Sequence, residues 1–212
     1  AGLIPVLAAG HAGAQQDIEL AIEPITVTAP RLVRDRQETP AAVSVVEEAS
    51  LQSGRQNLQL DESLNQVPGI FFQNRYNFAQ NLRLSMRGFG ARAPFGVRGI
   101  RLRVDGFAET LPDGQSQVDT SDLESAERVE VLRGPASSLY GNAAGGVVDV
   151  TTRSGPDDGY VQGRAALGQF GYRRVGAMGG GTEGDWRGHA SAWHMSMDGY
   201  RDQSATEKMM FN

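Results

Sequence analysis

The last quarter of the chain constrains the fold most, because polar and apolar residues alternate there along segments of roughly ten residues. Side chains of a strand point alternately to opposite faces, so each segment can present one apolar face. Such segments, joined by Gly/Asp turns, are typical of transmembrane β-hairpins. The shared faces are Val161, Ala165 and Leu167 opposite Gln162 and Arg164, and Trp193, Met195 and Met197 opposite His194, Ser196 and Asp198.

No stretch of the sequence is apolar and long enough for a transmembrane helix, so passage through a membrane would require a closed β-barrel. Three alternating segments, with a turn predicted at Gly179–Gly181, are recognisable between residues 154 and 212. Three strands cannot close a barrel, and the pattern continues to the last residue. We therefore expect residues 154–212 to be the first strands of an incomplete barrel.

Residues 41–153 have a different sequence pattern, which predicts a small α+β domain with a mixed sheet and short helices. Here short β-prone runs alternate with brief helical patterns and Gly or Pro turns. The strands are predicted around residues 43–46, 81–87, 100–104, 128–132 and 147–152, and the helices over residues 47–51, 58–67, 123–126 and 136–140.

The beginning of the chain predicts a secreted protein with an extended tail. A short apolar run over residues 2–9 precedes Ala12-Gly13-Ala14, which is the order of a signal peptide and its cleavage site, so residues 1–14 are interpreted as the remnant of a signal peptide. A disordered Ala/Gly-rich end is the alternative. Residues 15–40 are polar and contain three prolines, which favours an extended tail. Within it, residues 23–29 are β-prone and can add a strand to a partner's sheet, or form an ordinary linker.

Composition and spacing argue against several other functions. The net charge of −5 gives no support for nucleic-acid binding, and the absence of Cys excludes disulfides and thiolate metal sites. His189 and His194 are five residues apart, so on a strand they face opposite sides and cannot share a metal. The acidic residues Asp113, Asp119, Asp122 and Glu124 lack EF-hand spacing and are interpreted as a solvated loop.

Enzymatic chemistry also has little support. The loop Gly88–Gly90 loosely matches a dinucleotide fingerprint, but Pro94 and Gly96 interrupt the helix that such a site requires. Ser137 and Ser138 have no His near them in the sequence that could activate a nucleophile. We therefore expect no catalytic residues and no protein-bound metal or cofactor.

Three ordered blocks carry a resemblance to a known family. They are Leu84-Ser85-Met86-Arg87-Gly88-Phe89-Gly90, then Leu102-Arg103-Val104-Asp105-Gly106, then the fifteen residues 127–141, ERVEVLRGPASSLYG, followed by Gly145-Gly146-Val147-Val148. Together they closely resemble the plug domain of TonB-dependent outer-membrane receptors. The resemblance covers residues 23–153, with the start of the barrel behind it.

The resemblance implies a monomeric importer in the outer membrane of a Gram-negative bacterium, not an enzyme. Its plug would lie inside the barrel, and its N-terminal tail in the periplasm would bind TonB. The motifs at residues 90–99 and 112–115 resemble a subgroup that imports iron complexes, so a ferric siderophore is the expected cargo, with a small cofactor such as pyrroloquinoline quinone as the alternative. A signalling receptor would need a further folded domain before the TonB-binding segment, and only residues 15–22 separate that segment from the predicted cleavage site.

The resemblance also assigns candidate site residues. The segment similar to a TonB box is Glu23, Pro24, Ile25, Thr26, Val27, Thr28 and Ala29. The candidate substrate contacts are Arg75, Tyr76, Arg92, Phe95, Leu111, Asp113 and Gln115, whose guanidinium and aromatic groups suit an anionic or aromatic ligand, although they could be ordinary loop residues. The candidate contacts between plug and barrel are Arg87, Arg128, Glu130 and Arg133, which could equally stabilise the plug alone.

Overall fold

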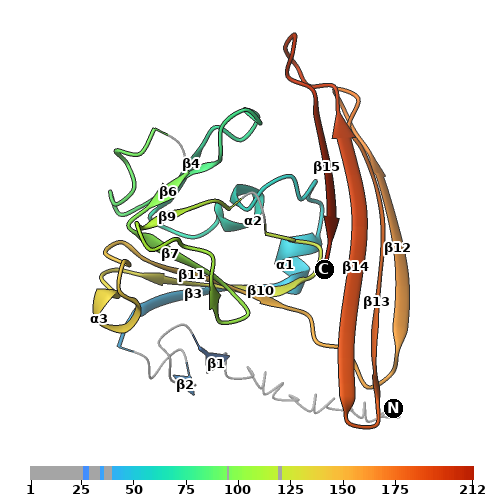
Figure 1. Ribbon diagram of the computed structural model, residues 1–212, viewed down its shortest axis with the longest axis horizontal. Coiled ribbons are helices and arrows are strands. Elements are labelled where there is room, and N and C mark those ends of the chain that lie inside the picture. Colours follow the sequence, from blue (N-terminus) through green and yellow to red (C-terminus); the bar gives the residue numbers. More distant parts are fainter. Residues whose placement is uncertain (1–25, 29–33, 36–39, 95, 119–120) are drawn as a thin grey trace, which may run out of the picture.

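The computed structural model describes residues 26–28, 34–35, 40–94, 96–118 and 121–212. Residues 40–153, called the plug region below, form two small sheets and three short helices (Figure 1). A tall curved sheet of four strands, called the wall sheet, stands beside them. The predicted signal-peptide remnant lies outside the described residues. No helix among the described residues has the length and apolar character needed to cross a membrane.

The main sheet of the plug region has the strand order β3-β10-β11-β7-β8. Strands β11 and β7 pair in parallel and the other pairs are antiparallel, so the sheet is mixed. The helix α1 follows β3 directly, and the turn α3 lies between β10 and β11. The bounds are β3 Ala42–Glu47, α1 Glu48–Gln52, β7 Ile100–Val104, β8 Phe107–Ala108, β10 Ala126–Arg133, α3 Ser137–Tyr140 and β11 Gly146–Thr152.

A second four-stranded sheet has the order β4-β5-β6-β9, with β5 and β6 parallel. Its strands are β4 Ile70–Gln73, β5 Arg83–Met86, β6 Val97–Arg98 and β9 Gln115–Ser116, and α2 Asp61–Leu64 precedes them. Two further strands, β1 Thr26–Val27 and β2 Arg34–Asp35, pair with each other beneath the main sheet in Figure 1.

The plug region has one main apolar core between its two sheets. The alternation of β10 and β11 places Val129, Val131, Val148 and Val150 on one face, where they pack with Leu84 of β5. The opposite face carries Glu130 and Asp149, together with a smaller apolar cluster around Leu132 and Val147. The strand pattern predicted for 41–153 is therefore confirmed, and the main sheet has both a dry face and a partly polar face.

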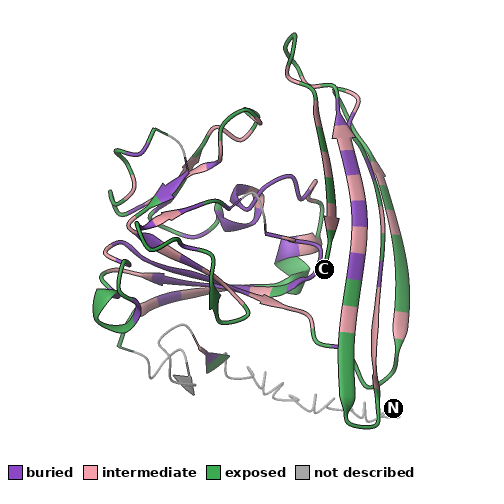
Figure 2. Cartoon of the chain, in the orientation of Figure 1, coloured by how far each residue is buried: buried purple, intermediate pink, exposed green. Residues whose placement is uncertain are grey.

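The wall sheet is an antiparallel meander of β12 Tyr160–Leu167, β13 Arg173–Glu183, β14 Trp186–Met197 and β15 Thr206–Phe211. Trp193, Met195 and Met197 are buried on the side toward the plug region, which produces the buried bands along β14 in Figure 2. Val161 and Leu167 are 90% and 85% exposed on the other side. The alternation predicted from the sequence is confirmed, and it continues into a fourth strand.

The turn predicted at Gly179–Gly181 is wrong. These glycines lie inside β13 and pair with β14, and the chain turns at Gly184-Asp185, between Glu183 and Trp186. Gly184 has φ +57°, a conformation that a two-residue hairpin loop requires and that glycine adopts without strain. A side chain at Gly180 would meet the carbonyl oxygen of Gly188 at 2.7 Å, so the run of glycines permits close backbone packing.

Two helix predictions are also corrected. Residues 123–125 form a bend because Asp122 Oδ1 accepts a hydrogen bond from the amide of Glu124, and such local side-chain bonds compete with a helix. The helix expected over residues 58–67 is limited to α2. There the carboxylate of Glu62 accepts hydrogen bonds from the amides of Gln56 and Leu58, which holds the preceding chain in a loop.

Candidate functional site

The segment Thr26–Thr28, the described part of the predicted TonB box, is docked on the partly polar face of the main sheet. Val27 is fully buried, and its backbone pairs with Arg34 of β2. Thr26 pairs with Asp35 in the same two-stranded sheet. The apolar cluster that encloses Val27 consists of Val43, Leu132, Ala136, Tyr140, Ala143 and Val147.

Glu130 of β10 holds the docked segment through its carboxylate. The amide of Thr28 donates to Oε2 at 2.8 Å, and the hydroxyl of Thr28 donates to Oε1 at 3.0 Å. Arg128 forms an ion pair with the same carboxylate at 3.3 Å and donates to the carbonyl oxygen of Thr26 at 3.4 Å. Glu130 is fully buried, so these charge-assisted bonds compensate for its removal from water.

A polar row continues from Glu130 across the sheet. Its partner on β11 is Asp149, which faces Arg103 of β7. Arg103 pairs with the Asp149 carboxylate at 2.7 Å and donates to the hydroxyl of Tyr140 at 3.1 Å. Burial raises the pKa of Asp149; nearby Glu130 and Asp105 raise it further, whereas Arg103 opposes the shift. The row lies at an open pocket lined by Thr28, Arg103, Asp105, Gly106, Arg128, Asp149 and Thr151.

The predicted contacts between plug and barrel have other partners in the described part of the chain. Arg128 and Glu130 bind each other and the segment Thr26–Thr28. Arg133 donates to the carbonyl oxygen of Pro68 at 2.9 Å and to the hydroxyl of Ser44 at 3.0 Å. Arg87 donates to the carbonyl oxygen of Arg133 at 3.5 Å, and burial lowers the pKa of Arg133. Contacts of these four residues with a barrel wall remain a prediction.

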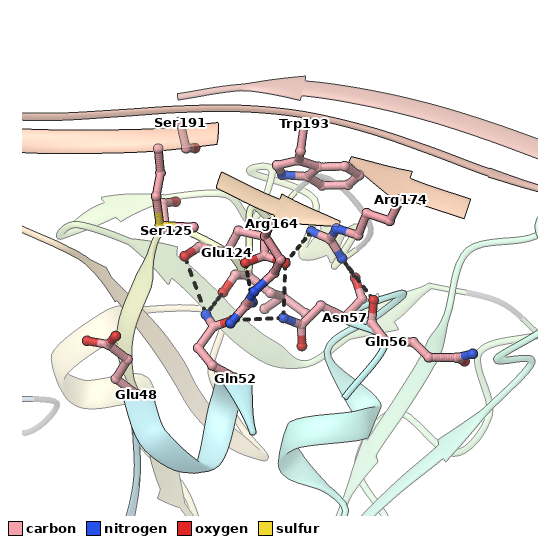
Figure 3. Close-up of polar contacts among 12 residues, drawn as sticks. Glu48, Gln52, Gln56, Asn57, Glu124, Ser125, Arg164, Arg174, Ser191 and Trp193 are labelled. Atoms are coloured by element: carbon pink, nitrogen blue, oxygen red, sulfur yellow. Dashed lines mark hydrogen bonds and ion pairs between the residues drawn. The ribbon is translucent and has the colours of Figure 1, made fainter. Parts of the chain in front are cut away.

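A different set of residues joins the plug region to the wall sheet (Figure 3). Arg164 of β12 and Arg174 of β13 reach the carboxylate of Glu124 at 2.6 and 3.0 Å. Arg164 also donates to Gln52 Oε1 at 2.7 Å, and Asn57 donates to that same oxygen at 2.9 Å. Only 4% of the Arg174 side chain and 5% of the Glu124 side chain are exposed, so this is a buried ion pair.

Asp122 forms a second polar contact with the wall sheet. Its two carboxylate oxygens accept hydrogen bonds from the Trp193 indole N–H and the Ser191 hydroxyl, each at 2.7 Å. The Trp193 ring also lies 4.2 Å from the guanidinium carbon of Arg174, in a cation–π contact. The solvated loop expected for Asp122 and Glu124 is therefore wrong. Two arginines on the inward face of a hairpin were the sequence signal that carboxylate partners were needed.

An apolar cluster completes this contact. Leu58 from the plug region packs with Tyr172, Trp193, Met195 and Met197, and Phe78, Ala166 and Met210 border the group. The Tyr172 hydroxyl donates to the carbonyl oxygen of Gln56 at 2.7 Å. The contact between the plug region and the wall sheet therefore combines buried ion pairs with a compact apolar patch.

Of the predicted substrate contacts, Tyr76 lies beside two loops of the wall sheet. Its ring is 6.0 Å from that of Tyr200, which in turn lies 6.1 Å from Phe170. All three rings are between 40% and 53% exposed, so they form an open aromatic surface across the plug region and the wall sheet. Arg75 forms an ion pair with the buried carboxylate of Asp61.

Arg92, Leu111 and Gln115 line two neighbouring pockets of the second sheet. Arg98 and Gln115 border both pockets, Arg92 borders one and Leu111 the other. Asp113 lies beside them, where its carboxylate accepts a hydrogen bond from the Gln115 amide at 3.0 Å, and that bond lowers the pKa of Asp113. Arg98, which was not among the predicted substrate contacts, borders both pockets together with Gln115. Phe95 lies outside the described residues, as do Glu23, Pro24, Ile25 and Ala29.

The described residues contain no group of three or more His, Cys, Asp and Glu side chains placed to hold a metal ion. His189 stacks on Tyr160, and His194 approaches the Glu207 carboxylate at 2.8 Å, so the two histidines have separate partners. The structure thus brings together a docked N-terminal segment, a polar and apolar contact with the wall sheet, and two pockets with an aromatic surface.

Comparison with known sequences identifies relatives. A sequence model described as the TonB-dependent receptor plug domain matches residues 35–147, just over half of the chain. The iron-regulated outer membrane virulence protein of Vibrio cholerae is 31% identical over 147 residues, which are 65% of this chain and 21% of that protein. The chain therefore spans about a fifth of the length of the curated relatives that it matches.

Solved structures share the fold. The ferric preacinetobactin receptor BauA of Acinetobacter baumannii superimposes with a TM-score of 0.69 at 15% identity, over 88% of this chain and 27% of that one. The pyoverdine outer membrane receptor FpvA of Pseudomonas aeruginosa superimposes with a TM-score of 0.63 at 21% identity, over 81% of this chain and 24% of that one. Both likenesses extend beyond residue 153 into the wall sheet, because each covers more than the plug region.

Proposed function

This chain belongs to the TonB-dependent receptor family. We propose that the whole protein imports a scarce ligand across the outer membrane and uses energy that TonB supplies. Its location is the outer membrane of a Gram-negative bacterium, and its family is one of transport receptors rather than an enzyme class. Residues 41–153 act as the plug, and residues 154–212 supply the first barrel strands. The proposed TonB-binding segment is residues 23–29.

The observation that carries the proposal is the docked segment Thr26–Thr28. A β-prone segment that a partner recognises by strand addition has to be presented in an extended conformation. Here it is extended, it precedes the plug region, and the amide and the hydroxyl of Thr28 bind Glu130 of β10. A periplasmic partner that binds this segment by strand addition would have to replace its pairing with β2.

We propose a ferric siderophore as the cargo. The proteins similar to this chain include an iron-regulated outer membrane protein and two receptors whose names refer to pyoverdine and ferric preacinetobactin, and none of these names refers to a quinone cofactor. The pockets bordered by Arg92 and Arg98 offer two guanidinium groups to an anionic ligand, and the Tyr76, Phe170 and Tyr200 rings offer a surface for aromatic groups.

The contact with the wall sheet suits a plug that has to move. Hydrogen bonds of Glu124 and Asp122 with the wall sheet can be exchanged for hydrogen bonds with water, whereas an entirely apolar contact would expose its whole area without compensation. Force on the tail would then displace part of the plug while the wall stays in the membrane.

Growth tests the function. A strain that lacks the receptor, carrying the full-length gene, should grow on a ferric siderophore as its only iron source when TonB is present and should fail when TonB is absent. Replacing Val27 by Pro should also abolish growth, because Pro cannot continue the strand pairing. Growth that persists without TonB would contradict the mechanism.

Binding tests the pockets separately. Arg92→Ala and Arg98→Ala in the full-length receptor should each weaken binding of the siderophore that supports growth by about tenfold, on the scale of one charge-assisted hydrogen bond. Arg83→Ala is the matched control, since Arg83 lies on β5 with its guanidinium bound to Gln73. Equal affinities for all three variants would place the ligand elsewhere.

A further inference from the structure

The face of the wall sheet that points away from the plug region, called the outward face below, is apolar over most of its height. Side chains alternate along each strand, and Arg174 and Trp193 point toward the plug region, so their neighbours in the sequence point away from it. Residues paired between neighbouring strands share a face, which extends this assignment across the sheet. The outward apolar side chains include Val161, Ala165, Val175, Ala177, Ala192 and Phe211.

Two features bound the outward face. Trp186 is exposed beside the turn Gly184-Asp185, and at the opposite end a row of paired residues crosses the sheet. This row, called the rim row, consists of Leu167, Arg173, Ser196 and Glu207.

The distance between these two features matches the thickness of a membrane. Trp186 and Ser196 both lie on β14, and ten residue steps correspond to about 33 Å along a strand. At the tilt of about 35–45° that barrel strands adopt, this length gives a height of about 23–27 Å, and the apolar band of outer-membrane barrels is about 25 Å tall. The rim row therefore lies at one boundary of the hydrocarbon layer.

The loops of the wall sheet indicate which boundary this is. The rim row lies at the end that carries the longer loops, residues 168–172 and 198–205, and the turn Gly184-Asp185 lies at the other end (Figure 1). In outer-membrane barrels the short turns lie in the periplasm and the longer loops lie outside the cell. The rim row thus faces the outer leaflet, which in Gram-negative bacteria consists of glycolipids that carry phosphate groups.

Arg173 differs from the other charged groups near the rim row. Within the described part of the chain, its guanidinium has no hydrogen-bond or ion-pair partner. Glu207 approaches His194 at 2.8 Å, and it lies two strands from Arg173, a separation of about 10 Å. A cation on the lipid-facing side costs free energy that increases with depth and is small at the interface, where headgroups supply anions. The planar guanidinium is well suited to binding phosphate with two hydrogen bonds.

We propose that Arg173 binds a phosphate group of a lipid headgroup in the outer leaflet, and that the rim row marks the outer boundary of the hydrocarbon layer. Ser196 pairs with Arg173 across β13 and β14, so its hydroxyl is placed to donate to the same phosphate. This inference rests on the proposed role of residues 154–212 as barrel strands. It does not depend on which cargo is imported.

The first measurement locates the rim row in the membrane. The chain has no Cys, so Ala177→Cys and Ser196→Cys each introduce one thiol on the outward face for a nitroxide label, in the full-length receptor with any other Cys removed. Ala177 pairs with Ala192, four residues before Ser196, so its label should lie about 10 Å deeper. In phospholipid vesicles, relaxation by lipid-soluble oxygen compared with relaxation by a water-soluble nickel chelate measures both depths.

The second measurement compares two lipids with the same acyl chains, diphosphoryl lipid A and its fully dephosphorylated form. Each is titrated onto the full-length receptor in detergent, and native mass spectrometry measures the bound fraction. The wild type should bind the phosphorylated lipid about tenfold more tightly, and Arg173→Ala should lose this preference, on the scale of one charge-assisted hydrogen bond. Arg173→Lys should keep part of it, because Lys retains the charge without the planar fork.

Arg187→Ala is the matched control for the lipid titration. Arg187 is also an exposed arginine of the wall sheet, but it lies next to Trp186 at the other end and pairs with Asp157. Its replacement should leave the preference for the phosphorylated lipid equal to that of the wild type.

The outcomes separate this inference from the proposed import. An unchanged preference in Arg173→Ala, or equal binding of both lipids by the wild type, would overturn the phosphate site. Labels at Ala177 and Ser196 of equal depth would overturn the boundary, and a label at Ala177 in water would overturn the role of residues 154–212 as barrel strands. Failure of the growth test would overturn import alone, because neither measurement involves TonB or a siderophore.

Discussion

The interior of the plug region and its contact with the wall sheet are held together by different chemistry. Between the two sheets of the plug region, the side chains of residues such as Leu84, Leu102 and Val131 are buried in an apolar core. At the wall sheet, the central contact is the buried cluster of Glu124 with Arg164 and Arg174. An apolar core excludes water and resists opening, whereas ion pairs can be replaced by hydration once the parts separate.

This difference explains how one chain can contain a stable unit and a separable joint. The main core makes the plug region cohesive, so force is transmitted through it as a body. The joint is specific, because each buried charge requires its own partner, and it combines these ion pairs with a compact apolar patch. Four substitutions test whether the two regions differ in this way.

The largest effect is expected for Glu124→Ala. Removing this carboxylate leaves the buried Arg174 guanidinium without its counter-ion, which should lower the free energy of unfolding by about 3–5 kcal/mol. Urea unfolding of the purified full-length protein measures it. Asp157→Asn is the control, because the Asp157–Arg187 pair is 86% and 51% exposed and should contribute less than about 1 kcal/mol. Similar losses for both variants would contradict the importance of the buried joint.

A core substitution should act on the other region. Leu84 is fully buried in the main core, so Leu84→Ala should cost about 2–5 kcal/mol through lost burial and a residual cavity. Amide hydrogen exchange can locate the effect: β5, β10 and β11 should exchange faster, while β12–β15 keep their protection. Equal acceleration in the wall sheet would mean that the two regions open as one unit.

A smaller effect is expected for Trp193→Phe. The change removes the indole N–H that binds Asp122 and weakens the cation–π contact with Arg174, while Asp122 keeps its bond from Ser191. We expect a loss of about 1–2 kcal/mol, again in urea unfolding. No loss would show that the apolar cluster, and not these polar contacts, holds Trp193 in place.

The smallest effect concerns pH and the partly polar face of the main sheet. The pKa of Asp149 is raised in the folded protein, so the folded state takes up a proton at higher pH than the unfolded chain. Its contribution to stability is therefore fully present below the unfolded pKa of about 3.9 and is lost as pH rises through the folded pKa. Asp149→Asn should remove this dependence, seen as a smaller difference between the unfolding free energies at pH 4 and pH 7. If Asp149→Asn leaves the difference between the two unfolding free energies unchanged, other carboxyl groups cause the pH dependence.

Much of the fold could be predicted from local patterns. The alternation of residues 128–132 and 147–152 gave β10 and β11, and the alternation around Trp193 gave β14. Where the predictions were wrong, nonlocal or side-chain contacts decided the structure. Gly179–Gly181 are typical of a turn, but pairing with β14 keeps them in a strand, and the Asp122 side chain prevents a helix over 123–126.

Less of the site could be predicted. The segment 23–29 and the pocket residues Arg92, Leu111 and Gln115 came from a family resemblance, and the sequence offered no distance between them and their partners. Arg128 and Glu130 were expected to contact the barrel, and in the described residues they bind Thr26 and Thr28. Glu124 was assigned to solvent because nothing near it in the sequence reveals that Arg164 and Arg174 lie above it.

Patterns along the chain therefore predicted the longer strands of both regions, the change from a mixed domain to alternating strands, and the family. These properties depend on side-chain periodicity and on contiguous motifs, which a linear pattern records directly. Which charges meet depends instead on how the chain folds. Glu130 and Thr28 are 102 positions apart, and their contact arises because the N-terminal segment covers the face of the main sheet on which the Glu130 side chain lies. The energy of a buried ion depends on the partners that folding brings to it, so its role is fixed only when the chain is folded.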